Sequence, residues 1–132
     1  MRADLFQSGT FTLHSGQESA WKVEADSLTE GDLETLARLI VGAVGPFRAV
    51  YGVPRGGLRL ALALAPTSRP WLPNLPVLVV DDILTTGSSM DEYRRLLETG
   101  GEPGPYLGVV LFARGPCPPW VRAVWTLGEW LR

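Results

Sequence analysis

Apolar residues recur at intervals of three and four positions in parts of the chain, and this spacing predicts helices. The clearest case is residues 33–44, where Thr29 and Asp32 are spaced to cap the start and Gly45-Pro46 ends the pattern. Residues 58–65 are apolar nearly all round, which is typical of a short buried helix. These patterns predict two helices in the first half of the chain.

A third helix is predicted after Ser88 or Ser89, either of which can cap it. Ser89 and Glu92 have the spacing of a capping box, and apolar residues then recur at helical intervals. Gly100-Gly101 ends the segment. The segment is therefore expected to be a helix with one face on the core.

Short apolar runs between these helices predict strands. The run 77–82 is unbroken and ends in two acids, which is typical of a central parallel strand. Residues 1–26 read as a loop followed by a short extended piece, and 66–76 contain four prolines that exclude a regular helix. The strands are expected at residues 47–53, 77–82, 106–113 and 121–127, with a one-turn tail after the last.

This order of elements predicts an α/β fold, a mostly parallel sheet flanked by helices, in a single compact domain over residues 1–132. Ligands of open α/β sheets bind beyond the carboxyl ends of the strands. Three loops with polar or glycine-rich sequence follow predicted strands, at residues 52–57, 81–89 and 113–115. We expect these loops to converge on one site.

Composition narrows the possible functions. The net charge of −2 argues against a nucleic-acid footprint, and no apolar run is long enough to cross a membrane. The N-terminal residues lack the apolar stretch of a signal peptide. One cysteine and one histidine exclude an internal disulfide and a two-histidine metal motif, which fits a reducing cytoplasm. Eleven of the twelve basic residues are arginine, so chemistry that needs lysine depends on Lys22.

Residues 79–89 (VVDDILTTGSS) carry the strongest chemical signal. A buried strand delivers Asp81 and Asp82 to a hydroxyl-rich loop around Gly87, and the loop leads into a helix. Backbone N–H groups at such a helix start favour a phosphate, while the acids suit sugar hydroxyls, Mg²⁺ or both. Each feature alone also fits an ordinary capped helix, but together they indicate a sugar-phosphate site. A Walker nucleotide site is excluded because Lys22 lies in no Gly-Lys-Ser/Thr context.

The same residues resemble the signature by which type I phosphoribosyltransferases bind 5-phosphoribosyl-1-pyrophosphate (PRPP). The signature has an apolar strand, two adjacent acids and a Thr-Thr-Gly turn, matched here from Val77 onward. Residues 52–57 (GVPRGG) lie where that family has its pyrophosphate loop, which often contains an unusual cis peptide. The segments 9–16 (GTFTLHSG) with Ser19, and 111–114 (LFAR), look like orotate phosphoribosyltransferases. The resemblance spans most of residues 5–114.

The resemblance implies a role for each of these positions. Asp81 and Asp82 are expected to hold the ribose hydroxyls, directly or through Mg²⁺, and Arg55 to contact the pyrophosphate. The 5-phosphate loop is Thr85, Thr86, Gly87, Ser88 and Ser89, and the pyrophosphate loop is Val53, Pro54, Arg55 and Gly56. An exposed turn arginine remains the alternative for Arg55.

On the base side, the resemblance implies that Arg114 contacts the carboxylate of orotate. His14 is a second base-binding candidate, at a position where the family commonly has lysine. Both are alternatively plain surface residues. Trp21, Trp120, Trp125 and Trp130 are either base-stacking residues or, more commonly at such spacing, core. The family covers its base with an N-terminal hood, which is reduced here.

The implied activity is transfer of 5-phosphoribosyl from PRPP to a nucleobase, orotate by preference, giving orotidine monophosphate and pyrophosphate in a cytoplasmic homodimer. The chain departs from orotate enzymes in residues 66–76, which replace a longer segment with a mobile, lysine-bearing lid. Lys22 lies outside that span, and Ala113 stands where aspartate is usual. The alternative is therefore a catalytically weak or silent PRPP- or nucleotide-binding module, acting as a sensor or partner subunit.

Overall fold

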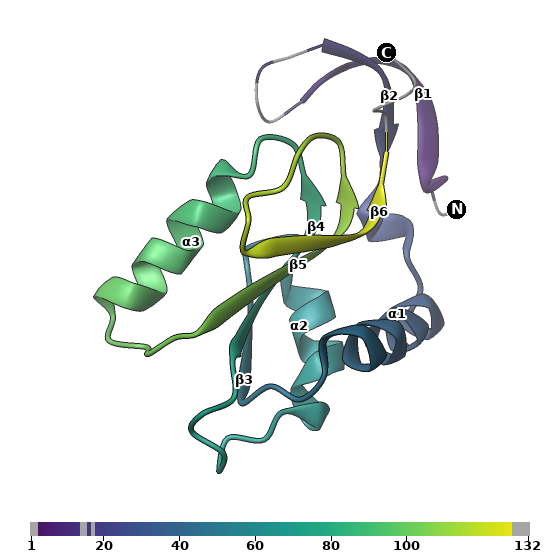
Figure 1. Cartoon of the computed structure of the whole chain (residues 1–132). Coiled ribbons are helices and arrows are strands. Elements are labelled where there is room, and N and C mark those ends of the chain that lie inside the picture. The colour runs from purple at the N-terminus through teal and green to yellow at the C-terminus, as the bar shows by residue number, and fades with distance from the viewer. Residues whose placement is uncertain (1–2, 14–15, 17, 128–132) are drawn as a thin grey trace.

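The computed structural model describes residues 3–13, 16 and 18–127, so His14, Trp130 and the expected C-terminal tail lie outside it. Six strands, three helices and two short 3-10 turns (Ala25–Ser27 and Ala65–Thr67) follow one another in this part of the chain (Figure 1). They are β1 (Phe6–Thr12), β2 (Glu18–Val23), α1 (Glu30–Val44), β3 (Ala49–Gly52), α2 (Leu58–Leu64), β4 (Val77–Leu84), α3 (Ser88–Thr99), β5 (Tyr106–Ala113) and β6 (Val121–Thr126).

Strands β3, β4, β5 and β6 form a parallel sheet in that order, which confirms the predicted α/β architecture. The unbroken apolar run at the start of β4 is fully buried from Val77 to Val80, as expected for a strand covered on both faces. β4 extends two residues further than the sequence pattern indicated, because Ile83 and Leu84 still pair with β5.

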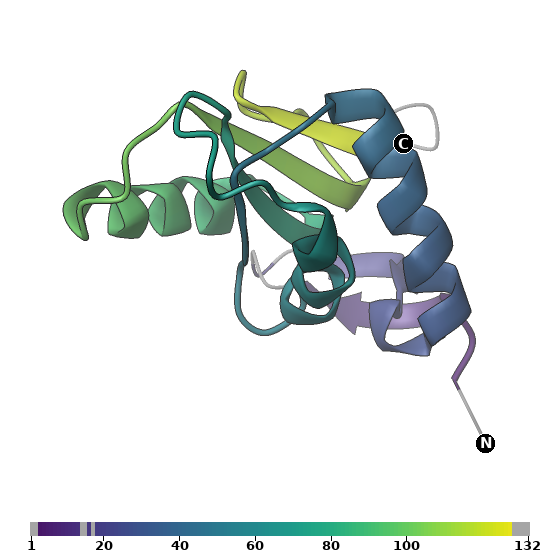
Figure 2. The same cartoon turned by 90° about the horizontal axis from the view of Figure 1, so that it is seen from below.

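Helices α1 and α2 cover one face of this sheet and α3 covers the other (Figures 1 and 2). Side chains alternate between the faces, so Leu78 and Val80 pack with α1 and α2. Val79, one position along, packs with Met90 of α3. These two cores fix β4, and with it the loop that follows, from both sides.

The predicted cap of α1 is confirmed and that of α3 is wrong. Thr29 Oγ1 accepts the Asp32 N–H at 3.0 Å, and Asp32 Oδ2 accepts the Thr29 N–H at 2.8 Å. In α3 the residue before the helix is Gly87, at φ 88°, which has no side chain to cap the helix, and Thr86 Oγ1 accepts the Ser88 N–H at 3.3 Å instead. Ser88 and Ser89 already lie within the first turn, so neither is in position to cap it.

The N-terminal segment is an antiparallel hairpin of β1 and β2, where the sequence pattern indicated a loop and a short extended piece. The pattern was weak because Val23 is the one buried residue in the two strands. Phe6 packs edge-on against Phe112 of β5, which stacks on Trp125 of β6. The hairpin therefore lies beyond the carboxyl ends of the parallel strands (Figure 1).

No helix among residues 3–13, 16 and 18–127 has the length and apolar character needed to span a membrane.

Candidate active site

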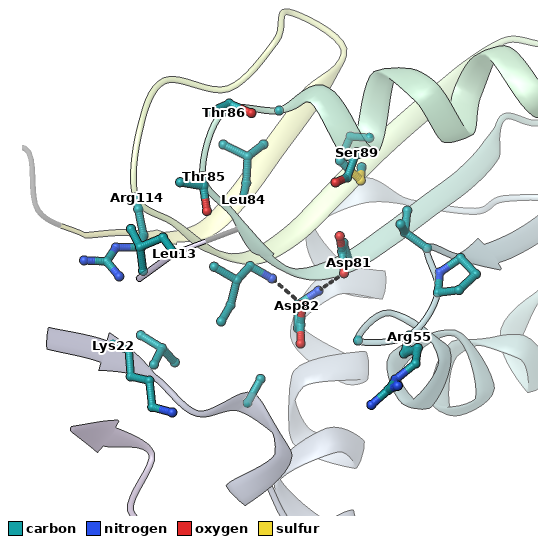
Figure 3. A pocket seen from close by; sticks show the side chains of 18 of the residues that line it. Leu13, Lys22, Arg55, Asp81, Asp82, Leu84, Thr85, Thr86, Ser89 and Arg114 are labelled. Atoms are coloured by element: carbon teal, nitrogen blue, oxygen red, sulfur yellow. Dashed lines mark hydrogen bonds between the residues drawn. The ribbon is translucent and has the colours of Figure 1, made fainter. Parts of the chain in front are cut away.

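A cavity of about 820 Å³ lies between the hairpin and the carboxyl ends of the strands. Three separate segments that the sequence singled out line it, at residues 53–56, 81–82 and 85–89, together with Arg114. Every predicted site residue in the described part of the chain is thus in one cavity (Figure 3). The convergence follows from the parallel sheet, whose strands all end at this edge.

The acid pair sits at the centre of the cavity, at the end of β4 (Figure 3). Asp81 is only 8% exposed, and its Oδ1 accepts the backbone N–H of Asp82 at 2.8 Å. Asp82 Oδ1 in turn accepts the N–H of Ile83 at 2.7 Å. Burial, together with the neighbouring Asp82, raises the pKa of Asp81 to about 8. The pair therefore favours a cation or a hydroxyl donor as its partner.

The loop after β3 approaches the acid pair closely enough to require glycine. A Cβ atom on Gly56 would lie 2.2 Å from Asp82 Oδ2, so any side chain there would displace the carboxylate. The preceding Pro54–Arg55 peptide is cis. Arg55 is exposed and its side chain extends into the space beside Asp82 (Figure 3). The loop thus brings Arg55 and the two acids to the lining of one cavity.

The loop between β4 and α3 has the features of an anion site. Gly87 holds a positive φ of 88°, and a Cβ there would meet Pro118 Cγ at 2.9 Å. Thr86 Oγ1 lies 2.9 Å from Ser88 Oγ, and Ser88 and Ser89 are exposed at the start of α3. The N–H groups of the first turn and the partial positive charge of the helix start lie at this wall of the cavity, and one of these groups, that of Ser88, donates to Thr86 Oγ1 at 3.3 Å.

Arg114 connects the end of β5 to the hairpin. Its guanidinium lies 3.6 Å from the centre of the Trp21 ring, and it donates to Trp21 O at 3.1 Å and to Ser19 Oγ at 2.6 Å. Partial burial lowers the pKa of Arg114. Two of its five N–H donors are used in these bonds, so the residue both anchors the hairpin and lines the cavity.

Sequence reasoning missed the residues that the hairpin and its connection to α1 contribute. Lys22, to which the sequence assigned no role in the site, lines the cavity from β2. Glu24 and Asp26 line it as well, and so does Arg59 of α2, which donates to Leu28 O at 2.8 Å. No local motif marks these positions, because the hairpin that carries them there is formed by long-range packing.

The tryptophans of the described chain do not line the cavity. The Trp21 ring is covered by Arg114, and Trp125 stacks on Phe112 at 5.4 Å. Trp120 donates through Nε1 to Asp91 Oδ1 at 2.8 Å. Trp21 and Trp120 pack against the two cores, as the alternative expected, whereas Trp125 is 44% exposed.

The donor set suits one kind of metal. Within residues 3–13, 16 and 18–127, no group of three or more metal-binding side chains is brought together. The cavity instead offers Asp81 and Asp82, hard oxygen donors, at its centre. Mg²⁺ is commonly bound through one or two carboxylates, with the remaining positions filled by water and substrate phosphate oxygens. Two carboxylates fit a Mg²⁺ ion that binds together with a phosphate-bearing substrate better than a metal ion held permanently by the protein alone.

Solved structures share this fold. Orotate phosphoribosyltransferase from Aeropyrum pernix superimposes with a TM-score of 0.76 and 27% identity, over 93% of this chain and 89% of that one. The Mycobacterium tuberculosis H37Rv orotate phosphoribosyltransferase in complex with inorganic phosphate gives 0.67 and 21%, over 91% and 87%. A phosphoribosyltransferase from Corynebacterium diphtheriae gives 0.67 and 16%, over 83% and 84%.

Sequence comparison is less informative, because neither a protein-family model nor a curated protein matches the chain. The similarity to phosphoribosyltransferases therefore rests on the comparison of structures.

Proposed function

We propose that this chain, which has the fold of the type I phosphoribosyltransferases, transfers the 5-phosphoribosyl group of PRPP to a nucleobase, with orotate as the preferred base. One observation carries the proposal. A single cavity is lined by a phosphate-binding loop, an acid pair, an arginine-bearing loop and a strand-end arginine. These correspond to the 5-phosphate, the ribose, the pyrophosphate and the base of the two substrates.

PRPP would bind with its 5-phosphate on residues 85–89. The backbone N–H groups at the start of α3 and the hydroxyls of that loop donate to the phosphate oxygens. Asp81 and Asp82 then lie where the ribose hydroxyls can donate to carboxylate oxygens. Because the loop and the acids are separated by only two residues, one rigid turn sets the distance between phosphate and ribose.

Asp81 and Asp82 would also hold Mg²⁺ together with oxygens of PRPP. The ion would supply positive charge against the pyrophosphate. Burial and the neighbouring Asp82 raise the pKa of Asp81, and a cation held by the pair would oppose this effect because it favours the ionised carboxylate.

The reaction breaks the bond between C1 of the ribose and a pyrophosphate oxygen, and forms a bond between C1 and a base nitrogen. The transition state resembles an oxocarbenium ion, so charge develops on the departing pyrophosphate. Arg55, exposed beside the acid pair, is placed to donate to it. The ring nitrogen of an anionic base needs no proton acceptor from the protein.

Orotate is favoured because it carries a carboxylate and the hairpin side of the cavity contains Arg114. A planar guanidinium binds a carboxylate through two parallel hydrogen bonds. The three N–H donors of Arg114 not directed at Trp21 and Ser19 are sufficient for this.

The second candidate is a PRPP- or nucleotide-binding module with weak or no turnover, acting as a sensor or partner subunit. It is favoured by the connection between α2 and β4, residues 65–76, which contains turns and 3-10 structure and contributes nothing to the cavity wall. A site left open to water is poorly suited to protecting a reactive intermediate.

We further propose that the chain acts as one cytoplasmic domain and as a homodimer. Support for the dimer comes from apolar side chains left exposed on α2 and the following turn, namely Leu58, Leu62, Trp71 and Leu72.

Formation of a nucleoside monophosphate from PRPP and Mg²⁺ tests the function, with orotate, uracil, adenine, hypoxanthine and guanine each supplied in turn. The proposal predicts product with one base, orotate by preference. The double variant Asp81→Asn/Asp82→Asn is the matched control and is expected to form none. PRPP binding without any product would support the binding module, and undiminished PRPP affinity in the double variant would contradict the site.

A further inference from the structure

Lys22 is the one lysine of the chain, and its side chain reaches the cavity from β2. Its ammonium group lies 3.4 Å from Glu24 Oε2 and 5.0 Å from the centre of the Phe11 ring. The side chain is 34% exposed, so the charge is partly shielded from water but still accessible to a ligand. A cation held in this way strengthens any anion site of which it is part.

The hairpin is shaped so that Lys22 is held over the cavity. β1 and β2 pair Ser8 with Trp21 and Phe11 with Ser19, so β1 has one extra residue in this interval. Such a bulge redirects the side chains around it. The Phe11 ring lies beneath the ammonium group of Lys22, and Lys22 itself faces the acid pair across the cavity (Figure 3).

The positions of the other cations indicate which part of a substrate Lys22 would contact. Arg55 stands on the opposite side of the acid pair (Figure 3), where the proposed function places the pyrophosphate. Residues 85–89 form a third wall, which is assigned to the 5-phosphate. Because the pyrophosphate and the 5-phosphate are assigned to these two walls, the base is assigned to the wall formed by the hairpin.

Lys22 is also the cation of that wall with the weakest existing attachments. Arg59 is bound to Leu28 O at 2.8 Å and lies 3.3 Å from Glu30, and Arg114 is bound to Trp21 and Ser19. The Lys22–Glu24 contact is a single one, at a long distance for an ammonium–carboxylate bond. Turning Lys22 toward a ligand therefore disturbs little of the structure.

We propose that Lys22 is a specificity-determining residue that binds the anionic substituent of the base alongside Arg114, so that the site selects a carboxylated base over its uncharged counterpart. This inference rests on the proposed function and deepens it. The Glu24 carboxylate binds the Lys22 ammonium group when no anion is bound. A substrate carboxylate then takes the place of Glu24.

The test compares two ligands that differ only in that carboxylate, orotidine 5′-monophosphate and uridine 5′-monophosphate. Isothermal titration measures their affinities for the intact protein without requiring turnover. The wild type should bind the orotidine nucleotide about 10- to 100-fold more tightly, the range for a hydrogen bond between charged groups. Lys22→Met should remove most of this preference while changing the affinity for the uridine nucleotide less than about threefold.

Two further variants show whether the charge of Lys22 causes the preference for the orotidine nucleotide. Lys22→Arg should retain most of the preference, because it keeps the cation. Glu24→Gln should increase affinity for the orotidine nucleotide by about 3- to 10-fold, because it removes the competing charge at constant size. Arg38→Met is the control. It removes one positive charge from the exposed face of α1, outside the cavity lining, and should bind both nucleotides as the wild type does.

The outcomes separate this inference from the proposed function. A preference abolished by Lys22→Met supports the inference, whether or not turnover is detected. A wild type that forms product but binds both nucleotides equally overturns the inference and leaves the transferase intact. Lys22→Met that weakens PRPP binding with the nucleotide preference unchanged assigns the residue to pyrophosphate instead. A wild type that binds neither nucleotide overturns both.

Discussion

The two ends of the cavity are built in different ways. At the phosphate end, residues adjacent in sequence make the site, since Asp81 to Ser89 form one strand end, one turn and one helix start. At the hairpin end, Arg114 reaches Ser19 and Trp21, which precede it by 95 and 93 residues. The phosphate end is therefore set by backbone geometry, and the hairpin end by side chains that the fold brings together.

This difference separates the chemistry from its specificity. The tight turns at the phosphate end tolerate almost no change, because atoms of the two loops already touch. At the hairpin end, we expect substitution to change which ligand is bound while leaving the sheet unaltered. Variants at the two ends should accordingly fail in different ways.

Gly56→Ala should cause the largest loss. The new Cβ would lie 2.2 Å from Asp82 Oδ2, so the carboxylate or the loop must move. A displacement of this size is expected to weaken PRPP binding at least about 100-fold, as measured by titration in the presence of Mg²⁺.

The matched control for this variant is Gly42→Ala. Gly42 lies in α1, where an added Cβ meets nothing within 4 Å. The change should stabilise the protein by about 0.5–1 kcal/mol and leave PRPP affinity as it is. Near-normal PRPP binding by Gly56→Ala would contradict the close packing of the two loops.

Arg114→Met should act on the base rather than on PRPP. The variant loses the guanidinium that lines the cavity and its two bonds to the hairpin. We expect kcat/KM for orotate to fall about 10- to 100-fold and amide hydrogen exchange in residues 18–23 to become faster. Arg122→Met, an exposed change on β6, is the control. Unchanged exchange in the hairpin would show that Arg114 does not hold it.

The acid pair should make the unliganded protein less stable as pH rises. With its folded-state pKa raised to about 8, Asp81 keeps a proton that the unfolded chain has released by about pH 4. The folded state therefore binds more protons between these values, and its free energy of unfolding falls with increasing pH up to about pH 8.

Asp81→Asn tests this directly, because it cannot ionise. Urea unfolding at pH 6 and pH 9 should give a decline of about 1–3 kcal/mol in the wild type and much less in the variant, since one pKa unit is worth about 1.4 kcal/mol. Glu34→Gln, an exposed change on α1, should decline as the wild type does. Equal declines in Asp81→Asn and the wild type would assign the pH dependence to another group.

Thr29→Ala should have the smallest effect and should leave the site alone. It removes the side chain that accepts the Asp32 N–H at the start of α1. The expected cost is about 1 kcal/mol of unfolding free energy with no change in PRPP affinity. A change in affinity would mean that α1 does more than support the sheet.

The parts of the molecule that the sequence predicted are those with local signals. The apolar run of β4 predicted the central strand, and Thr29 with Asp32 predicted the start of α1. The acids and glycine after the run predicted a polar loop at the end of the sheet, which lines the cavity. Each of these features depends on residues a few positions apart, and the local preference of those residues agrees with their tertiary packing.

The rest depends on contacts that no local pattern records. The hairpin was missed because its strands are mostly exposed, and only packing such as Phe6 on Phe112 fixes their place. Lys22 was not assigned to the site for the same reason. The start of α3 was misread because Gly87, in a left-handed conformation, takes the position that Ser88 or Ser89 was expected to fill.

A crystal structure with Mg²⁺ and orotidine 5′-monophosphate would test the division of the cavity most directly. The account predicts the phosphate on residues 85–89, the ribose over Asp81 and Asp82, and the base against the hairpin with its carboxylate within reach of Arg114. A nucleotide bound the other way round, with its base toward residues 85–89 and its phosphate at the hairpin, would contradict it.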